Sequence, residues 1–223
     1  MNLALFDLDH TLLPLDSDFE WGQFLMRIGA VERGAFEQRN ADFFAQYQAG
    51  KLDPLAYLAF AFGTLAQFPR KQLDDWHLQY MAEVIQPAIL PAARDLVARH
   101  QDRGDLVAII TATNRFVTAP IASAFGVPHL IAAEPETTAT GEITGKTLGI
   151  PPYGEGKVVN TNAWLAAQGK SLQGFGTSHF YSDSQNDIPL LSLVTHPVAT
   201  NPNAKLAAHA QAHGWPILKL FND

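Results

Sequence analysis

The chain has 223 residues, 47% hydrophobic and 17% charged, a composition typical of a packed globular protein and not of a disordered one. Its formal net charge of -7 argues against nucleic-acid binding through general electrostatics, and the absence of cysteine excludes disulfides and thiolate metal sites. The first residues run directly into a predicted strand, and no segment approaches the ~20 apolar residues that span a bilayer. We therefore expect a cytoplasmic protein with no membrane partner.

Residues 3–6 form a short apolar run that ends in two carboxylates, Asp7 and Asp9. The run is too short for a helix and predicts a strand that is buried on both faces, as in parallel sheets. Because strand side chains alternate, the two carboxylates point to the same side. Two anions placed so close favour a magnesium site beside a nucleophilic carboxylate. For this pair alone, a polar turn or a helix cap is an equal alternative.

Helical periodicity follows from residue 19 to about residue 87, with no convincing strand. We expect four helices, with stops at Gly29 and Gly50 and with Asp53 capping the third. Four helices inserted directly after the first strand predict a separate lid, so residues 15–87 are the expected cap and residues 1–14 and 88–223 the expected core domain. We interpret the aromatic side chains of the cap as core packing, including the stripe Phe36, Phe43, Phe44 and Tyr47.

From Pro91 onward, predicted strands alternate with helices, which indicates an α/β fold with a doubly wound parallel sheet. These strands are residues 106–110, 129–132, 178–181 and 197–199. We expect residues 133–156 to be irregular, apart from a small hairpin at residues 141–145. In such sheets ligands bind beyond the carboxyl ends of the strands. The polar clusters predicted there are Asp7 and Asp9, then Thr111, Thr113 and Asn114, then Asp183, Asn186 and Asp187, with Lys157 reaching the same place from a helix start.

Together these groups can hydrolyse a phosphate monoester. Asp7 can act as the nucleophile and form an aspartyl-phosphate, and Asp9 can act as a general acid and then as a base. Mg²⁺ would bind Asp7, Asp183 and the backbone carbonyl of Asp9, with support from Asp187. Thr111 can donate a hydrogen bond to the phosphoryl group, and Lys157 can neutralise charge. Each residue alone has a plainer explanation, as a helix cap or a surface lysine, but their joint occurrence at strand ends favours a site.

The chain resembles the haloacid dehalogenase superfamily of phosphohydrolases, in its phosphoserine-phosphatase-like branch (subfamily IB). The first motif matches as Asp7-Leu8-Asp9-His10-Thr11, the second as a strand ending at Thr111, the third as Lys157 and the fourth as Asp183-Ser184-Gln185-Asn186-Asp187. The resemblance covers essentially the whole chain. It implies a Rossmann-like core with an inserted helical cap, Mg²⁺ as cofactor and a small phosphate ester as the substrate.

The motifs are less specific for the substrate. The resemblance places Asp16, with Asp18 close by, where phosphoserine phosphatases hold the substrate amine, although a helix cap is an equal alternative for Asp16. Those enzymes also carry an arginine for the substrate carboxylate, and here Ala59 takes its place and residues 50–68 contain no arginine. A substrate with an amine and no carboxylate is therefore expected. Further candidates for substrate contacts are Thr113, Asn114 and Asn186.

Relatives in this branch resemble histidinol-phosphatases, so L-histidinol phosphate is the expected substrate, with a role in histidine biosynthesis. The alternatives are a phosphatase for phosphoserine or another small phosphate, and a phosphotransferase that passes the phosphoryl group to another acceptor. An alternative from another class is a non-catalytic binding protein on the same scaffold. The sequence does not indicate the oligomeric state.

Overall fold

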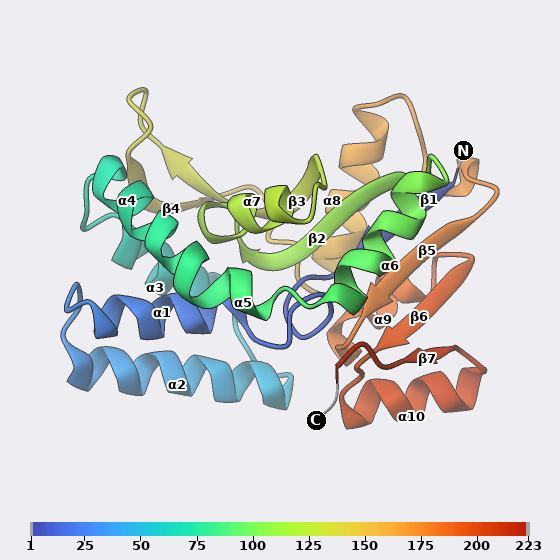
Figure 1. Cartoon of the computed structure of the whole chain (residues 1–223), viewed down its shortest axis with the longest axis horizontal. Helices are drawn as coiled ribbons and strands as arrows, with labels where there is room; N and C mark the ends of the chain where they lie inside the picture. Colours follow the sequence, from blue (N-terminus) through green and yellow to red (C-terminus); the bar gives the residue numbers. More distant parts are fainter. Residues whose placement is uncertain (1, 222–223) are drawn as a thin grey trace.

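The computed structural model describes residues 2–221 and contains a seven-stranded sheet in the order β4-β3-β2-β1-β5-β6-β7 (Figure 1). The strands are β1 (Leu3–Phe6), β2 (Leu106–Asn114), β3 (His129–Thr137), β4 (Ile143–Leu148), β5 (Ser178–Ser182), β6 (His196–Thr200) and β7 (Ile217–Leu218). All neighbouring pairs are parallel except β3 and β4. The predicted α/β fold with a doubly wound sheet is therefore confirmed.

The central strand, β1, is buried on both faces, as its apolar run predicts. Ala4 and Phe6 belong to one hydrophobic cluster, and Leu3 and Leu5 belong to another on the opposite face. Helices α6 (Pro91–Asp102) and α7 (Arg115–Ala124) pack on the first face and lie in front of the sheet in Figure 1. Helices α8 (Glu155–Ala166), α9 (Ile188–Leu191) and α10 (Ala204–His213) contribute to the second cluster.

The order of the strands reverses at β1. From there the chain adds β2 and β3 on one side, and later β5, β6 and β7 on the other. Leu3 pairs with Leu106 of β2 and with Ser178 of β5, so the three strands run in parallel and their carboxyl ends meet at one edge. Such a switch point leaves a crevice at the carboxyl ends, where ligands of doubly wound sheets bind.

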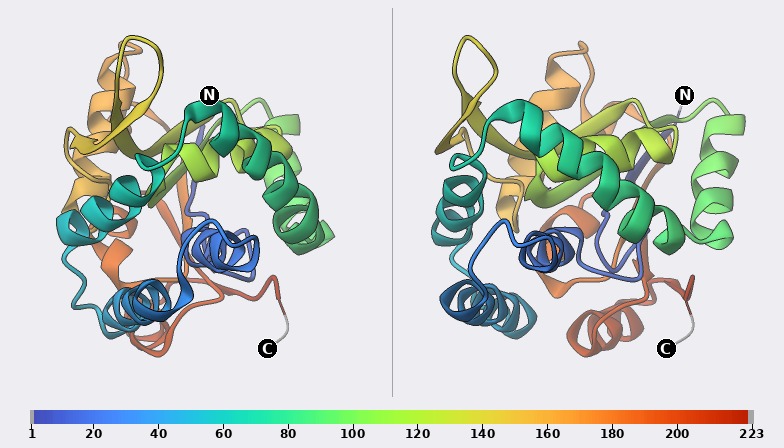
Figure 2. Two further views of the ribbon diagram at one scale, coloured as in Figure 1. Left: turned by 90° about the vertical axis from the view of Figure 1, so that its left-hand side faces the viewer. Right: turned by 60° about the vertical axis from the view of Figure 1, so that its left-hand side comes forward.

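The helical segment, which we define as residues 15–87, contains α1 (Ser17–Arg27), α2 (Arg33–Ala49), α3 (Pro54–Leu65) and α4 (Arg70–Tyr80). The chain then continues without a break through a π-helical turn, η1 (Met81–Ile85), into α5 (Gln86–Ala88). The Asp53 carboxylate caps α3 as predicted, since it accepts hydrogen bonds from the amides of Leu55 and Ala56. Both views of Figure 2 show α1 and α2 side by side. None of the helices in residues 2–221 combines the length and the apolar character that a membrane crossing requires.

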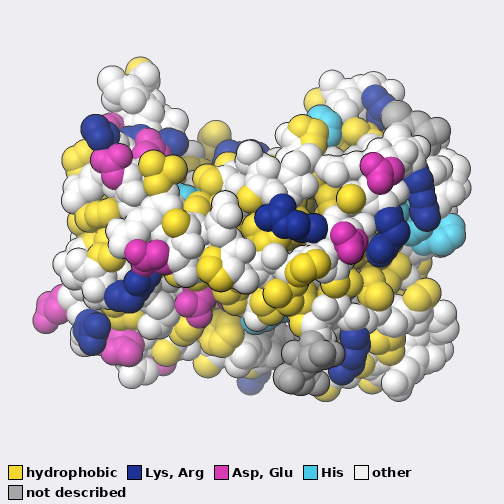
Figure 3. Space-filling model, in the orientation of Figure 1, with side chains coloured by type: hydrophobic (Ala, Val, Ile, Leu, Met, Phe, Trp, Pro, Cys, Tyr) yellow, Lys and Arg dark blue, Asp and Glu magenta, His cyan; other side chains and the backbone are white. Residues whose placement is uncertain are grey.

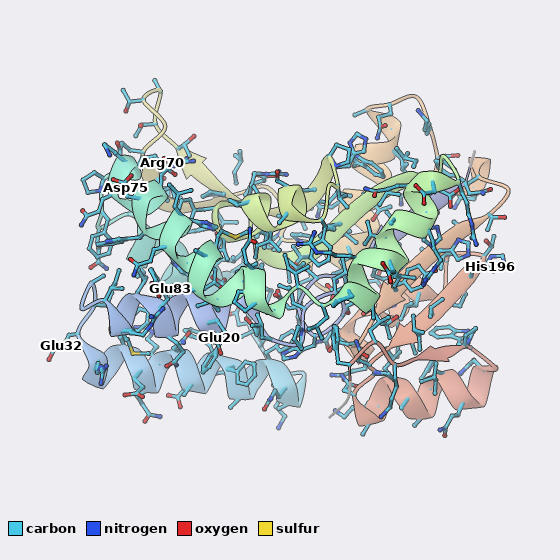
Figure 4. All side chains as sticks on the ribbon, viewed as in Figure 1. Glu20, Glu32, Arg70, Asp75, Glu83 and His196 are labelled. Carbon is cyan, nitrogen blue, oxygen red and sulfur yellow. The ribbon has the colours of Figure 1, made fainter. Side chains whose placement is uncertain are left out.

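Two predictions about the sheet are wrong. Strand β2 does not end at Ile110 but continues to Asn114, because its Thr and Asn side chains find polar partners and β-branched threonine suits a strand. Residues 133–148 are not irregular, since β3 extends to Thr137 and forms an antiparallel hairpin with β4 that is longer than the small one expected at residues 141–145. Residues 149–154 contain no helix or strand, as expected. The hairpin packs on α3 and reaches the start of α4, where Figure 4 labels Arg70. There Glu142 accepts a hydrogen bond from the amide of Arg70 at 2.7 Å.

The helical segment and the sheet share one hydrophobic cluster. Trp21 of α1 lies with its ring centroid 5.6 Å from that of Phe116 on α7. Phe24 and Leu25 belong to the same cluster as Phe6 of β1. On the face seen in Figure 3, charged side chains of both signs are scattered between apolar ones. The segment is therefore packed onto the sheet through an apolar interface.

Candidate active site

The Asp7 carboxylate lies directly after β1 at the switch point and is buried. Its Oδ1 accepts a hydrogen bond from Nζ of Lys157 at 2.6 Å, and its Oδ2 accepts one from the hydroxyl of Thr11 at 3.0 Å. Lys157 lies in the first turn of α8, after Gly156. A Cβ at Gly156 would collide with the carbonyl oxygen of Pro151, so the turn that carries Lys157 toward Asp7 requires glycine there.

Two more carboxylates, Asp183 and Asp187, follow β5 and lie beside Asp7. Oδ2 of Asp187 accepts hydrogen bonds from Nζ of Lys157 at 2.6 Å and from the Ser182 hydroxyl at 2.7 Å. Burial, then the charges of Asp7 and Asp187, raise the pKa of Asp183 well above its usual value. Burial lowers the pKa of Lys157, but the charges and hydrogen bonds of Asp187 and Asp7 raise it by more. The pKa of Lys157 is therefore above its usual value, and the lysine stays charged. One cation thus faces three carboxyl groups.

Asp9 has a different environment from Asp7. Its Oδ1 accepts a hydrogen bond from the amide of Ser17 at 2.8 Å, and its Oδ2 accepts one from the Thr113 hydroxyl at 2.7 Å. Burial raises its pKa from 3.8 to about 7, and the nearby Asp16 adds to this shift while the Ser17 bonds oppose it. A carboxyl group with a pKa near neutrality can both give and take a proton.

The last residues of β2 form one wall of the site. Thr111 and Thr113 line a pocket together with Asp7, Asp9 and Lys157, so the structure brings these predicted residues to one place. Oγ1 of Thr111 accepts a hydrogen bond from the amide of Thr113 at 3.1 Å, which leaves its own hydrogen available to a ligand. The hydroxyl of Thr113, in contrast, already donates its hydrogen to the Asp9 carboxylate.

The predicted residues Asp16 and Asn186 also line this pocket. The Asp16 carboxylate caps α1 by accepting hydrogen bonds from the amides of Asp18 and Phe19, so capping and exposure to the pocket occur together. Burial raises its pKa to about 6, although these bonds oppose the shift. Nδ2 of Asn186 is buried and has no hydrogen-bond partner within residues 2–221, which makes it a free donor at the edge of the site.

Two predicted substrate contacts, Asp18 and Asn114, lie elsewhere. Neither lines the pocket that contains Asp7. They bond to each other, since Nδ2 of Asn114 donates a hydrogen bond to Oδ1 of Asp18 at 3.0 Å. A small separate cavity is lined by Asp18 and Trp21. Within the described chain, neither Oδ2 of Asp18 nor Nε1 of Trp21 has a hydrogen-bond partner. A direct contact of Asp18 or Asn114 with a substrate stays a prediction.

The roof of the pocket is aromatic, and the sequence analysis missed this because it assigned the rings of the helical segment to the core and gave no role to Tyr153. The rings come from the helical segment and from the loop before α8, and they are Phe19, Phe43, Phe44, Tyr47, Tyr57 and Tyr153. A signal was present in the sequence: Phe43, Phe44 and Tyr47 lie on a helix that is otherwise mostly polar. Thr11 and Ser182, which orient Asp7 and Asp187, were also missed as functional residues.

The donors for a metal ion are few. Within residues 2–221 no group of three or more histidine, aspartate or glutamate side chains forms a metal cluster. The hydroxyl of Thr11 nevertheless lies 3.0 Å from Oδ2 of Asp7 and 3.4 Å from Oδ1 of Asp183, so two carboxylates converge there. Hard oxygen donors with an excess of buried negative charge suit Mg²⁺, which keeps several of its waters and needs few protein ligands.

Comparison with known proteins identifies relatives along the whole chain. Residues 4–192 match the model of the haloacid dehalogenase-like hydrolase family. The chain is 44% identical over 217 residues to a histidinol-phosphatase of Neisseria meningitidis serogroup C (strain 8013), covering 97% of this chain and 98% of the relative. It is 31% identical over 222 residues to the phosphoserine phosphatase SerB1 of Mycobacterium tuberculosis, covering 96% and 69%. A crystal structure of a protein of unknown function from Bordetella pertussis Tohama I is 50% identical, covers 99% of each chain and superposes with a TM-score of 0.93.

Proposed function

Because the chain belongs to the haloacid dehalogenase-like hydrolase family, we propose that it is a Mg²⁺-dependent phosphatase that works through an aspartyl-phosphate on Asp7. The prediction of a phosphoric monoester hydrolase is confirmed at the level of the enzyme class. The observation that carries the proposed mechanism is the position of the Asp7 carboxylate, held at 2.6 Å by Lys157 in the pocket that also contains Asp9.

In the first step, an oxygen of Asp7 attacks phosphorus, the phosphorus–oxygen ester bond breaks, and Asp9 gives its proton to the departing alcohol oxygen. In the second step, water attacks the same phosphorus while Asp9 takes a proton from it, and the Asp7 carboxylate is released with inorganic phosphate. One ester and one water thus yield one alcohol and one phosphate. The raised pKa of Asp9, about 7, suits a group that changes protonation state twice in one cycle.

The groups around Asp7 have supporting roles. Lys157 donates hydrogen bonds to Asp7 and Asp187 and can offset the charge of the phosphoryl oxygens. Thr111 offers a hydroxyl hydrogen and Asn186 a free amide, both from the rim of the pocket. The amide of Ser17 and the hydroxyl of Thr113 hold Asp9 in one orientation.

The carboxylates of Asp7 and Asp183 and the backbone carbonyl of Asp9 are the ligands we assign to Mg²⁺, with Asp187 next to them. When bound, the ion neutralises phosphoryl charge and relieves the repulsion among the buried carboxylates. The raised pKa of Asp183 is consistent with this assignment, because burial and then the charges of Asp7 and Asp187 outweigh the opposing effect of Lys157.

We assign residues 15–87 as the cap that covers the site, and residues 1–14 and 88–223 as the core that carries the catalytic carboxylates. In support, the roof residues Phe19, Phe44 and Tyr57 come from this helical segment, whereas Asp7, Thr111 and Lys157 come from the strand ends and α8. A covered site excludes bulk water while the aspartyl-phosphate exists.

We propose L-histidinol phosphate as the substrate. Asp16 is the one carboxylate in the pocket away from the reaction centre, and it can pair with an amine. No arginine lines the pocket within the described part of the chain, so a substrate carboxylate would be left unpaired. The aromatic roof suits a planar imidazole ring. The 44% identical relative, named as a histidinol-phosphatase, supports the same choice. The cytoplasmic location expected from the sequence stays a prediction.

Steady-state kinetics on L-histidinol phosphate, L-phosphoserine and p-nitrophenyl phosphate, with MgCl₂ and with EDTA, tests these proposals. We expect hydrolysis only with Mg²⁺, loss of turnover in Asp7→Asn, and the highest kcat/KM for L-histidinol phosphate. Turnover by Asp7→Asn at the wild-type rate would reject the nucleophile, and a clear preference for phosphoserine would reject the substrate. An alkyl phosphate formed in the presence of a competing alcohol would indicate phosphotransfer.

A matched pair of variants tests Asp16. Asp16 and Asp53 both cap helices of the helical segment, but only Asp16 lines the pocket. Asparagine caps as well as aspartate, so both substitutions preserve the helix start. We expect Asp16→Asn to raise KM for L-histidinol phosphate about 10-fold or more and to leave that for p-nitrophenyl phosphate nearly unchanged, with no such change in Asp53→Asn. Equal effects in both variants would reject the amine contact.

A further inference from the structure

The carboxyl-terminal end of α2 lies over the candidate active site. Most of α2 is exposed, and its only fully buried side chains within the described residues are Asn40 and Phe43. Tyr47, one turn before the end of the helix, is half-buried and lines the pocket that contains Asp7 and Lys157. The ring is therefore turned toward the reaction centre and is not part of a closed core.

Tyr47 lines the same pocket as Asp7 and Asp187. Burial, followed by the charges of Asp183, Asp7 and Asp187 in that order, raises the pKa of Tyr47 well above its usual value. The phenol is consequently neutral and carries a hydrogen that it can donate at any physiological pH. Within residues 2–221 this hydroxyl forms no hydrogen bond.

A contact between α2 and the loop after β5 fixes the position of Tyr47. Gly50 ends α2 in the left-handed conformation, with φ of 68°, and its amide donates to the carbonyl oxygen of Tyr47 at 2.9 Å. A Cβ at Gly50 would lie 2.9 Å from Nε2 of Gln185 and 3.7 Å from Oδ1 of Asn186. The end of the helix thus rests directly on the turn that carries Asn186 and Asp187.

We propose that Tyr47 donates its hydroxyl hydrogen to a non-bridging oxygen of the phosphoryl group, which makes it a substrate-contacting residue supplied by the helical segment. This inference rests on the proposed phosphatase function. The free donor faces a site whose other protein groups are mostly acceptors, and an incoming phosphoryl group brings anionic oxygens that such a donor suits. The phosphoryl group would then be contacted from below by Lys157 and Thr111 and from above by Tyr47.

Binding of inorganic phosphate to the Mg²⁺-loaded protein, measured by titration calorimetry, tests the contact without depending on the identity of the substrate ester. Tyr47→Phe removes only the hydroxyl group. Tyr181→Phe is the matched control, because its hydroxyl bonds to Nε2 of His100 at 2.8 Å and does not line the pocket. We expect Tyr47→Phe to weaken phosphate binding roughly 10- to 100-fold, the usual effect of losing a hydrogen bond to a charged group. Tyr181→Phe should bind phosphate within about twofold of wild type.

Kinetics on the best phosphate ester gives a second readout. If Tyr47 contacts the phosphoryl group in the ground state, loss of its hydroxyl in Tyr47→Phe raises KM by a factor similar to the loss of phosphate affinity. A merely structural role would not change KM and phosphate affinity together. Wild-type phosphate affinity in Tyr47→Phe, or equal losses in both variants, would overturn the inference and leave the phosphatase function standing. A wild-type protein that neither binds phosphate nor hydrolyses any ester would overturn the proposed function as well.

Discussion

Nζ of Lys157 lies 2.6 Å from Oδ1 of Asp7, although 150 positions separate the two residues in the chain. The same nitrogen lies 2.6 Å from Oδ2 of Asp187, and all three side chains are buried. The lysine therefore joins the ends of β1 and β5 through two charge-assisted bonds. Lys157 is a catalytic candidate because it lines the pocket, and it is structurally important because it pairs with two buried carboxylates.

Removal of this lysine is expected to destabilise the protein. Lys157→Met leaves two carboxyl groups buried without their cation, which costs about 3–5 kcal/mol of unfolding free energy in the absence of Mg²⁺. Urea denaturation at pH 7.5 measures this loss. Lys71→Met is the control, because Lys71 is exposed and pairs with Asp75 only on the surface of α4, so little change is expected there. Equal stability of wild type and Lys157→Met would contradict the pairing.

Mg²⁺ should affect stability as well as activity. Because Asp183 is buried beside Asp7 and Asp187, Asp183→Asn removes one of the repelling charges and is expected to raise the unfolding free energy of the metal-free protein by about 1–3 kcal/mol. The same variant should lose most of its phosphatase activity.

Thermal unfolding with EDTA and with MgCl₂ checks both parts of this expectation. The Tm of wild type should rise on addition of Mg²⁺, since the ion binds the folded state. Asp183→Asn should show a higher Tm than wild type in EDTA and a smaller rise with Mg²⁺. An identical rise in both proteins would argue against Asp183 as a ligand.

Much of the site was predictable because its motifs are local. A short apolar run before Asp7 and the Gly156-Lys157 helix start each indicate position and chemistry within a few residues. The end of β2 was not predictable in the same way. Thr113 and Asn114 look like loop residues until their partners Asp9 and Asp18 are known, and those partners lie about 100 residues away in the chain.

The role of Tyr47 was hidden for a related reason. An aromatic residue at helical spacing from Phe43 fits a core stripe equally well, and the helical pattern alone does not tell whether the ring meets other apolar side chains or a pocket. The close approach of Gly50 to Gln185 and the pocket lining by Tyr47 place this end of α2 over the carboxylates. That contact depends on the relative position of two elements that are distant in sequence.

The shared hydrophobic cluster predicts that the helical segment and the sheet unfold together. Trp21→Ala removes a buried ring that packs against Phe116 of α7 and should cost about 3–5 kcal/mol. Leu78→Ala, at a side chain that is 72% exposed on α4, is the control and should stay within about 0.5 kcal/mol of wild type. Guanidinium unfolding followed by far-UV circular dichroism and by tryptophan fluorescence should give one coincident transition in each protein. Two separated transitions would indicate that the segment is an independent unit.

The pH dependence of stability should reveal Asp18. Burial raises its pKa from 3.8 to about 6, although the Tyr57 hydroxyl and the Asn114 amide oppose the shift. Since the folded-state pKa lies above the unfolded one, the protonated form stabilises the fold below about pH 4. This contribution is lost as the pH rises through about 6. The difference corresponds to about 3 kcal/mol between the two limits.

Asp18→Asn removes the titrating group and keeps the oxygen that accepts the hydrogen bond from Asn114. The stability of this variant relative to wild type should therefore increase by about 3 kcal/mol between pH 4 and pH 7.5, with most of the change between pH 4 and 6.5. Urea denaturation across this range measures it. A difference that stays constant with pH would mean that Asp18 is ionised in the folded protein at all these pH values, with the Asn114 hydrogen bond and the Tyr57 hydroxyl offsetting the cost of burial.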